Sequence, residues 1–223
     1  GGALHSLFLK SDGTVWACGY NFHGELGDGT NTNRAIPAYV SSLGNVVAIE
    51  AGEGASYALK DDGTIWAWGD NTYGQLGDGT NNNSNQPVQV LGPGTFSAIS
   101  AHHEHVLALR DDSTVWAWGR NTEGEIGDPT PGNQNIPVQV VQLDQVHSIE
   151  AGGYLSLVQK DDGTIWAFGT NAYGQLGDGT NTSSAVPVQV VSFPSCISSI
   201  ATGFWIGLAF EEPDSIMAWG YNN

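Results

Sequence analysis

Residues 60–67 read KDDGTIWA, and the same eight residues recur unchanged at 160–167. A second stretch, YGQLGDGTN at 73–81, recurs unchanged at 173–181. The tryptophan at position 66 belongs to a series of four that are each spaced by 50 residues. A fixed period of about 40–50 residues is typical of propellers and solenoids, in which each repeat forms one supersecondary unit. The sequence therefore predicts a tandem-repeat protein.

Each repeat is predicted to form four short strands, as the second repeat illustrates. Residues 56–59 and 64–68 flank an Asp-Gly pair, which is a strong hairpin signal because glycine adopts positive φ at low cost. A third strand, 87–90, begins with a proline at a position that needs no ladder donor. Residues 96–101 form the fourth. No helical periodicity is present, so the fold class is all-β with four-stranded antiparallel blades.

The blades are predicted to stack radially, because a four-stranded sheet of this size has two apolar faces that it cannot bury alone. The triplets WAW at 66–68 and 116–118, and WAF at 166–168, are assigned to the core between blades. Cys18 replaces the last aromatic residue of the triplet in the first repeat, which predicts a buried, structural cysteine. Cys18 and Cys196 have no metal-ligand spacing; two reduced core cysteines are favoured over one bridge.

The pattern G-x-x-x-S-x-x-L-x-x-D-G-x-[VI]-W-x-x-G-x-N-x-x-G-[QE]-[LI]-G-D, followed by P-x-x-V, resembles the repeat of the regulator of chromosome condensation family, in its bacterial form. The second repeat matches it at Gly52, Ser56, Leu59, Asp62, Gly63, Trp66, Gly69, Asn71, Gly74, Gln75, Leu76, Gly77, Pro87 and Val90. The resemblance covers essentially the whole chain and implies a β-propeller, commonly of seven blades. Because the motif residues are structural, it implies the fold more strongly than the function.

The whole chain, 1–223, is predicted to be a single repeat domain. The repeats are 2–51, 52–101, 102–151 and 152–202, with a partial fifth repeat at 203–223. Four strands per repeat plus one final hairpin give 18 strands, which leaves half a blade with an open edge and predicts an incomplete ring in this chain. Either the chain is a piece of a longer protein, which is favoured, or half-blades pair between subunits.

The charge of the chain limits its partners. There are 23 Asp and Glu residues against six Lys and Arg, which gives a formal net charge of −17. So acidic a surface repels phosphate backbones, so we expect no nucleic-acid partner. No apolar run approaches the roughly 20 residues that cross a bilayer, so no membrane span is predicted. No signal peptide is recognisable at the start of the chain, but the chain begins within a repeat, so a leader can simply be missing.

The third repeat departs most from the others. It has His-His-Glu-His at 102–105 where the second repeat has Gly-Glu-Gly-Ala at 52–55. If this segment is a strand, His103 and His105 share one face and could bind Zn²⁺ or Cu²⁺ as weak candidate metal ligands. No third ligand is visible in the sequence, so hydrogen bonding in a loop is favoured and no cofactor is predicted.

Two further departures concern surface residues. Phe204 and Trp205 stand where other repeats have mostly small or polar residues. They are candidate partner contacts, although burial against a blade that this chain lacks is favoured. Asn82 and Asn181 match the N-glycosylation pattern, which matters only in a secreted protein. The DGTN segments, as at 78–81, are interpreted as tight turns rather than calcium loops.

No catalytic residues are predicted. The sequence lacks a nucleophile elbow, a Ser-His-Asp set and a phosphate loop, and its paired carboxylates recur with the repeat. The resemblance implies a family that includes a nucleotide exchange factor, a plant UV-B photoreceptor and a secreted bacterial inhibitor of β-lactamase. We expect a non-enzymatic protein-interaction propeller, extracellular or on the cell surface, that binds through loops on one face. The alternatives are a structural subunit of an extracellular assembly or fibre, and a small-GTPase nucleotide exchange factor.

Overall fold

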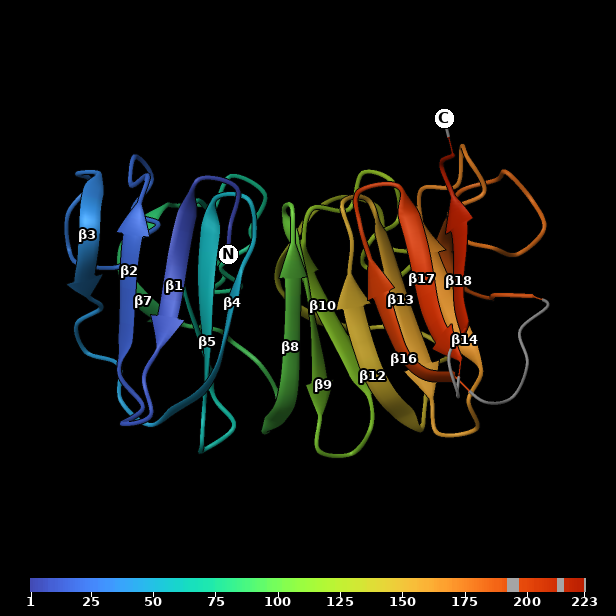
Figure 1. Cartoon of the computed structure of the whole chain (residues 1–223), viewed down its shortest axis with the longest axis horizontal. Coiled ribbons are helices and arrows are strands. Elements are labelled where there is room, and N and C mark those ends of the chain that lie inside the picture. The colour runs from blue at the N-terminus through green and yellow to red at the C-terminus, as the bar shows by residue number, and fades with distance from the viewer. Residues whose placement is uncertain (192–196, 212–214, 223) are drawn as a thin grey trace.

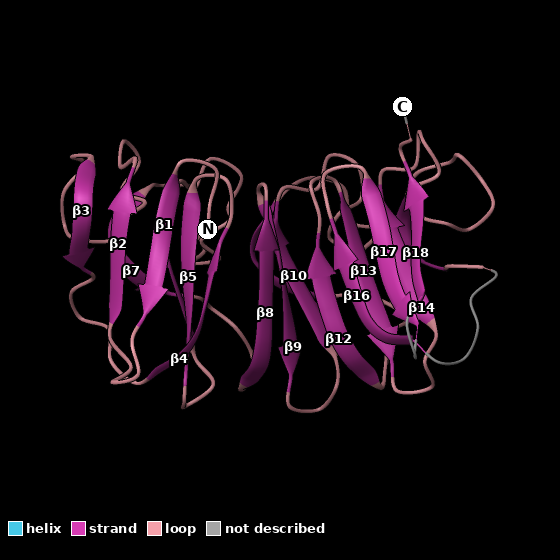
Figure 2. Ribbon diagram, in the orientation of Figure 1, coloured by secondary structure: helices cyan, strands magenta, loops and turns pink. Residues whose placement is uncertain are grey.

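The computed structural model describes residues 1–191, 197–211 and 215–222. Within these residues Figure 2 shows strands and loops and no helix. In the described residues, therefore, no helix is long and apolar enough to cross a membrane. The strands form five antiparallel sheets, which confirms the predicted all-β fold class.

The sheets follow one another along the chain. The first contains β1 (His5–Leu9), β2 (Val15–Gly19) and β3 (Arg34–Tyr39). The second contains β4 (Val46–Ala51), β5 (Ala55–Lys60), β6 (Ile65–Gly69) and β7 (Ser84–Gln89). The third contains β8 (Phe96–His102), β9 (His105–Arg110), β10 (Val115–Gly119) and β11 (Gln134–Gln139). The fourth contains β12 (Val146–Ala151), β13 (Leu155–Lys160), β14 (Ile165–Gly169) and β15 (Ser184–Gln189). The fifth contains β16 (Ile197–Thr202), β17 (Ile206–Glu211) and β18 (Ser215–Gly220).

Each sheet is one blade of a propeller. The first strands of successive blades, β4, β8, β12 and β16, contact one another in that order, as expected of the strands nearest a propeller axis. Figure 1 shows β1–β3 at one end of the molecule and β18 at the other. The described residues thus form an arc of blades and no closed ring, as the strand count predicts.

The structure fixes the blade boundaries, which the period alone leaves open. The strand that ends each sequence repeat, such as β8 at the end of 52–101, pairs with the next sheet. The predicted total of 18 strands is confirmed among the described residues, but the predicted half-blade is wrong. The blades after the first take their first strand from the preceding repeat. The strands that do not belong to the three complete blades therefore form a three-stranded sheet at each end of the molecule.

The strand that the sequence predicts at 87–90 is β7, the fourth strand of its blade, and it begins earlier than predicted. β7 starts at Ser84, and its register against β6 shifts between Ala67 and Gly69. Pro87 consequently lies inside the strand and not at its first position. Proline has no backbone N–H to donate to a neighbouring strand. This is tolerated because β7 lies at the edge of its sheet and its pairing with β6 is irregular.

Neighbouring blades are joined by the last aromatic residue of each triplet. Trp68 and Trp118 are fully buried, and their indole N–H groups donate to the carbonyl oxygens of Glu25 and Gln75 in the preceding blade, both at 2.9 Å. The prediction of an inter-blade core is therefore confirmed for this position. Trp66, at the first position of its triplet, is only half-buried and donates to a threonine hydroxyl of its own hairpin.

Cys18 is half-buried rather than buried, contrary to the prediction. It occupies the position at which Trp68 packs on the preceding sheet, and none of the sheets formed by the described residues covers that side of β1–β3. Cys18 is a free thiol. Cys196 lies outside the described residues.

Candidate binding face

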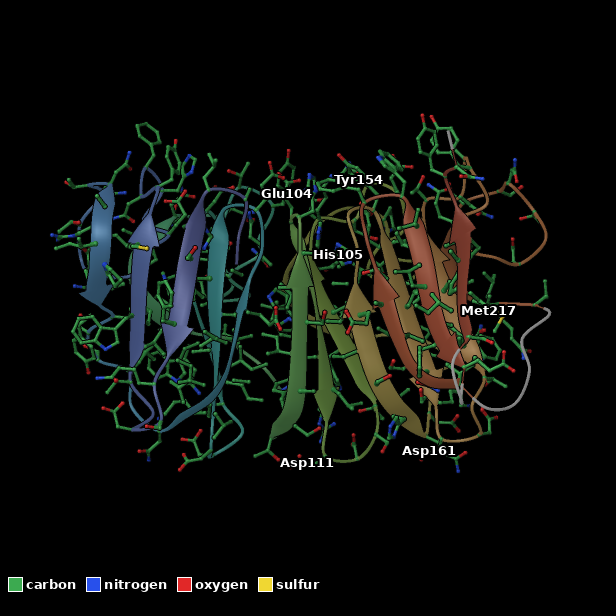
Figure 3. All side chains as sticks on the ribbon, in the orientation of Figure 1. Glu104, His105, Asp111, Tyr154, Asp161 and Met217 are labelled. Carbon is green, nitrogen blue, oxygen red and sulfur yellow. The ribbon has the colours of Figure 1, made fainter. Side chains whose placement is uncertain are left out.

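Loops leave the blades along two opposite edges, and Figure 3 labels Glu104 and Tyr154 along one and Asp111 and Asp161 along the other. We call the second edge the hairpin face. It consists of the turns between the second and third strands of each blade, at 61–64, 111–114 and 161–164 and, in the first sheet, 10–14. We call the first edge the loop face. It consists of inner loops at 52–54, 103–104, 152–154 and 203–205, and outer loops at 20–33, 70–83, 120–133 and 170–183.

The carboxylates of the hairpin face stabilise turns. Asp62 accepts hydrogen bonds from the backbone N–H of Thr64 at 3.0 Å and from its hydroxyl at 2.6 Å. Those bonds hold the pKa of the Asp62 carboxyl below its usual value. Asp12, Asp112 and Asp162 make the same contacts. The second carboxylate of each recurring pair therefore stabilises a hairpin turn, which explains why it recurs with the repeat.

Each outer loop is organised around one buried asparagine. In the second blade the Asn71 amide donates to the backbone oxygens of Thr80 and Asn82, both at 3.1 Å, and its Oδ1 accepts from Leu76 N–H at 2.9 Å. Asp78 accepts from the backbone N–H and hydroxyl of Thr80, both at 2.9 Å. These bonds confirm that the DGTN segment is a turn, and they hold the loop in one conformation.

The inner loops are bonded both to the outer loops and to each other. Arg120 N–H donates to the Glu104 carbonyl at 2.9 Å, and equivalent bonds occur in the other blades. Between blades, Glu53 N–H donates to the His103 carbonyl at 2.9 Å, and Gly153 N–H donates to the Gly203 carbonyl at 3.1 Å. Side chains on the loop face therefore rest on a hydrogen-bonded backbone.

Aromatic side chains gather on the loop face of the last two blades. The Tyr154 ring centroid lies 4.9 Å from Trp205, which lies 5.9 Å from Tyr173, which in turn lies 4.8 Å from Tyr221. We call these four residues the aromatic run. Tyr173, Trp205 and Tyr221 keep 51%, 36% and 41% of their surfaces exposed. Phe204 continues the run, 6.3 Å from Tyr154 and 46% exposed.

An ionic cluster adjoins the aromatic run. His103 Nε2 lies 2.9 Å from Glu53 Oε2, and His103 Nδ1 lies 3.4 Å from Glu104 Oε2. Arg120 lies 3.6 Å from Glu104, 2.8 Å from the buried Glu125, and 4.6 Å above the Tyr154 ring. The guanidinium group thus connects the charged cluster to the aromatic run.

Burial shifts the ionisation of this cluster. Desolvation raises the pKa of the Glu104 carboxyl to about 7, although Arg120 opposes the shift. Desolvation also lowers the pKa of His103, against the opposing charge of Glu53. Near neutral pH the His103 imidazole therefore favours its neutral form, in which one ring nitrogen is free to accept or to bind a metal.

The two histidines predicted as metal candidates lie in different environments. His103 is in the turn between β8 and β9, with a φ of 40°, so the two do not share a strand face as the prediction required. His105 is buried in β9, where its Nε2 lies 3.0 Å from the Ser156 hydroxyl. His5 makes the same contact with Ser56 in the first sheet. His105 is therefore part of the repeat scaffold, and burial lowers its pKa to about 3.

The structure places the other predicted surface residues on the loop face. Phe204 and Trp205 keep 46% and 36% of their surfaces exposed there, while their rings lie against Tyr154 of the preceding blade. Asn82 and Asn181 are both exposed in outer loops. Partner contact and glycosylation at these four positions stay predictions.

Sequence reasoning missed six residues of this face, among them Tyr154 and Tyr221 of the aromatic run. Glu104 and Arg120 come from the third blade, and Glu53 meets them only through the contact between two blades. Tyr173 repeats Tyr73 within an identical nonapeptide and so resembles a structural residue. The one signal available was the departure from the repeat at 102–105 and 204–205.

A family model described as the RCC1-like domain matches residues 1–223. The chain belongs to this family. The match confirms the resemblance seen in the repeats, and it agrees with the antiparallel blades described above.

Solved structures show the same fold. Human WBSCR16 is 23% identical, with a TM-score of 0.88 over 99% of this chain and 60% of its own. Prp20p from Saccharomyces cerevisiae, whose structure was studied together with its binding properties to Gsp1p and histones, is 22% identical. Its TM-score is 0.82 over 100% of this chain and 55% of its own. This chain therefore spans little more than half the length of these proteins.

Proposed function

We propose that this propeller is a non-enzymatic module that binds a protein partner through the loop face. The observation that carries the proposal is the aromatic run, where Tyr173, Trp205 and Tyr221 are exposed on a hydrogen-bonded loop scaffold. Tryptophan and tyrosine are enriched among the residues that dominate binding energy at protein interfaces. Rigid loops reduce the entropy lost when such a surface binds.

The charge of the chain indicates the kind of partner. A formal net charge of −17 favours association with a protein that presents a basic surface, and it disfavours nucleic acid. Prp20p, which shares the fold, has been studied for binding to the proteins Gsp1p and histones. Protein binding by an RCC1-like propeller is therefore a reasonable expectation for this chain.

Photocrosslinking tests this proposal and identifies the partner. A photoreactive amino acid is placed at Tyr173 on the loop face and, in a matched variant, at Asp161 on the hairpin face. We expect one protein to be crosslinked from position 173, and the purified protein to bind the unmodified chain. Crosslinking from position 161 alone would contradict the proposal, because the partner would then bind the hairpin face.

Self-association is a second candidate. Ile36 in the first sheet and Ile216 in the last are among the most exposed apolar residues, at 75% and 70%. Native mass spectrometry tests this candidate, and a stable monomer at micromolar concentration would contradict it. The exchange-factor alternative and the extracellular location stay predictions; a nucleotide-release assay on any GTPase partner tests the former.

A further inference from the structure

Three potential metal ligands meet at the junction of two inner loops on the loop face. Glu53 comes from the loop between β4 and β5, and His103 and Glu104 come from the turn between β8 and β9. Each side chain offers one ligand atom, and these atoms all lie within 4.8 Å of one another. The loop contact that joins the two blades thus also brings the three side chains together.

The spacing of these atoms suits a small divalent ion. The three ligand atoms lie no more than 4.8 Å apart, so geometry guarantees a position that is within about 2.8 Å of all three. An ion at that position would lie close to each ligand atom. Zinc is bound at about 2.0–2.1 Å by imidazole nitrogen and at about 2.0–2.2 Å by carboxylate oxygen. Side-chain movements of less than about 1 Å therefore bring all three atoms to bonding distance.

The central histidine is held in place by its surroundings. Its side chain is 12% exposed, and its ring lies 4.7 Å from Tyr154 and 5.7 Å from Phe204. Its Nδ1 is buried and has no hydrogen-bond partner among the described residues. Glu53 Oε2 lies 2.9 Å from its Nε2, and Glu104 Oε2 lies 3.4 Å from its Nδ1. Both carboxylates are therefore already next to the ring that would supply the nitrogen ligand.

The repeat does not require this cluster. Residues at the position of His103 in the other blades are Ala3, Glu53, Gly153 and Phe204, and all of these blades form the same inner loop. A non-glycine residue at a φ of 40° is uncommon, and such backbone is found disproportionately at functional sites. The neighbouring Arg120 is partly neutralised by the buried Glu125, so the local charge remains negative.

We propose that Glu53, His103 and Glu104 bind one Zn²⁺ ion, with water at the open position. Imidazole nitrogen and carboxylate oxygen are both ligands that zinc accepts, and open zinc sites have three protein ligands with water in the fourth position. The bound ion ties the second blade to the third at the loop face. Zinc binding at this site does not require the proposed protein partner.

Isothermal titration of the untagged chain with ZnCl₂ tests the site. We expect one ion per chain, and binding weakened at least about tenfold by His103→Asn, Glu104→Gln or Glu53→Gln. The control is His23→Asn, because His23 lies 3.2 Å from Glu25 on the same face but has no second carboxylate in its cluster among the described residues. We expect this variant to bind zinc as the unmodified chain does.

Cobalt absorption supplies a second readout that does not depend on heat. Co²⁺ at the site is expected to give the visible bands of low-coordinate cobalt in the unmodified chain, and Glu53→Gln, a change at a half-exposed side chain, is expected to diminish them. Absence of zinc binding by the unmodified chain overturns the proposal. Binding that all three ligand variants retain also overturns it, because the ion then binds elsewhere.

Discussion

Trp118→Phe tests how strongly neighbouring blades are coupled. The Trp118 side chain is 0% exposed, and its indole N–H donates to the Gln75 carbonyl of the preceding blade at 2.9 Å. Phe168, which is also fully buried, already occupies the equivalent position one blade later. The substitution therefore reproduces a packing arrangement that the fold accepts, and its cost measures the missing hydrogen bond and the missing volume.

The expected cost follows from these two losses. A hydrogen bond of this kind contributes about 1 kcal/mol net. The smaller ring leaves a cavity of about 40 Å³, which costs about 1 kcal/mol at ~24 cal/mol per Å³, and the lost apolar contact adds up to about 1 kcal/mol. We expect Trp118→Phe to lower the free energy of unfolding by about 2–3 kcal/mol, and Trp118→Ala to lower it by about 3–5 kcal/mol.

Urea denaturation monitored by circular dichroism measures these differences, provided that the m-value is unchanged. The matched control is Trp116→Phe in the same strand, where the ring is half-buried and donates only to the Thr114 hydroxyl at 3.3 Å. We expect this control to cost less than about 1 kcal/mol. Equal costs at positions 116 and 118 would refute the reasoning, because the blades would then not be joined mainly through Trp118.

Three further substitutions test other parts of the scaffold. Gly77→Ala places a Cβ 2.9 Å from the Trp118 indole nitrogen at a φ of +63°, so a loss of at least about 2 kcal/mol in urea denaturation is expected. Asn71→Ala removes the bonds that organise an outer loop, and we expect hydrogen exchange over 70–83 to accelerate at least about tenfold. Burial, aided by Glu50, raises the pKa of Glu150 to about 7, so the folded state holds a proton that the unfolded chain releases. Stability should therefore fall as pH rises from about 4.5 to about 7, and Glu150→Gln should flatten this profile and stabilise the protein at pH 8 by roughly 1–3 kcal/mol in thermal denaturation.

The repeat made most of the fold predictable. A 50-residue period, an Asp-Gly turn and a recurring tryptophan fix the strands and their antiparallel pairing, because these depend on local turns. Blade boundaries could not be predicted, since a period is the same whichever residue begins it. The pairing of β8 with β9 instead of β7 depends on a contact made only after the chain has crossed to the next blade.

The candidate site was only partly predictable for a related reason. Departure from the repeat indicated His103, Phe204 and Trp205. Glu53 is 50 residues away from His103, and only the packing of two inner loops brings them together. His105 was a misleading candidate, because its role depends on a hydroxyl in the next blade that the sequence pattern does not connect to it.

The affinity of the crosslinked partner for a loop-face variant tests the central claim most directly. The variant combines Tyr173→Ala and Trp205→Ala, and its control is Asp161→Asn on the hairpin face. Removal of two interface aromatics costs at least about 2 kcal/mol when they carry the binding, which is about a 30-fold loss of affinity. We predict such a loss for the loop-face variant, with the control unchanged. Affinity that is the same for both variants and the unmodified chain would contradict binding through the aromatic run.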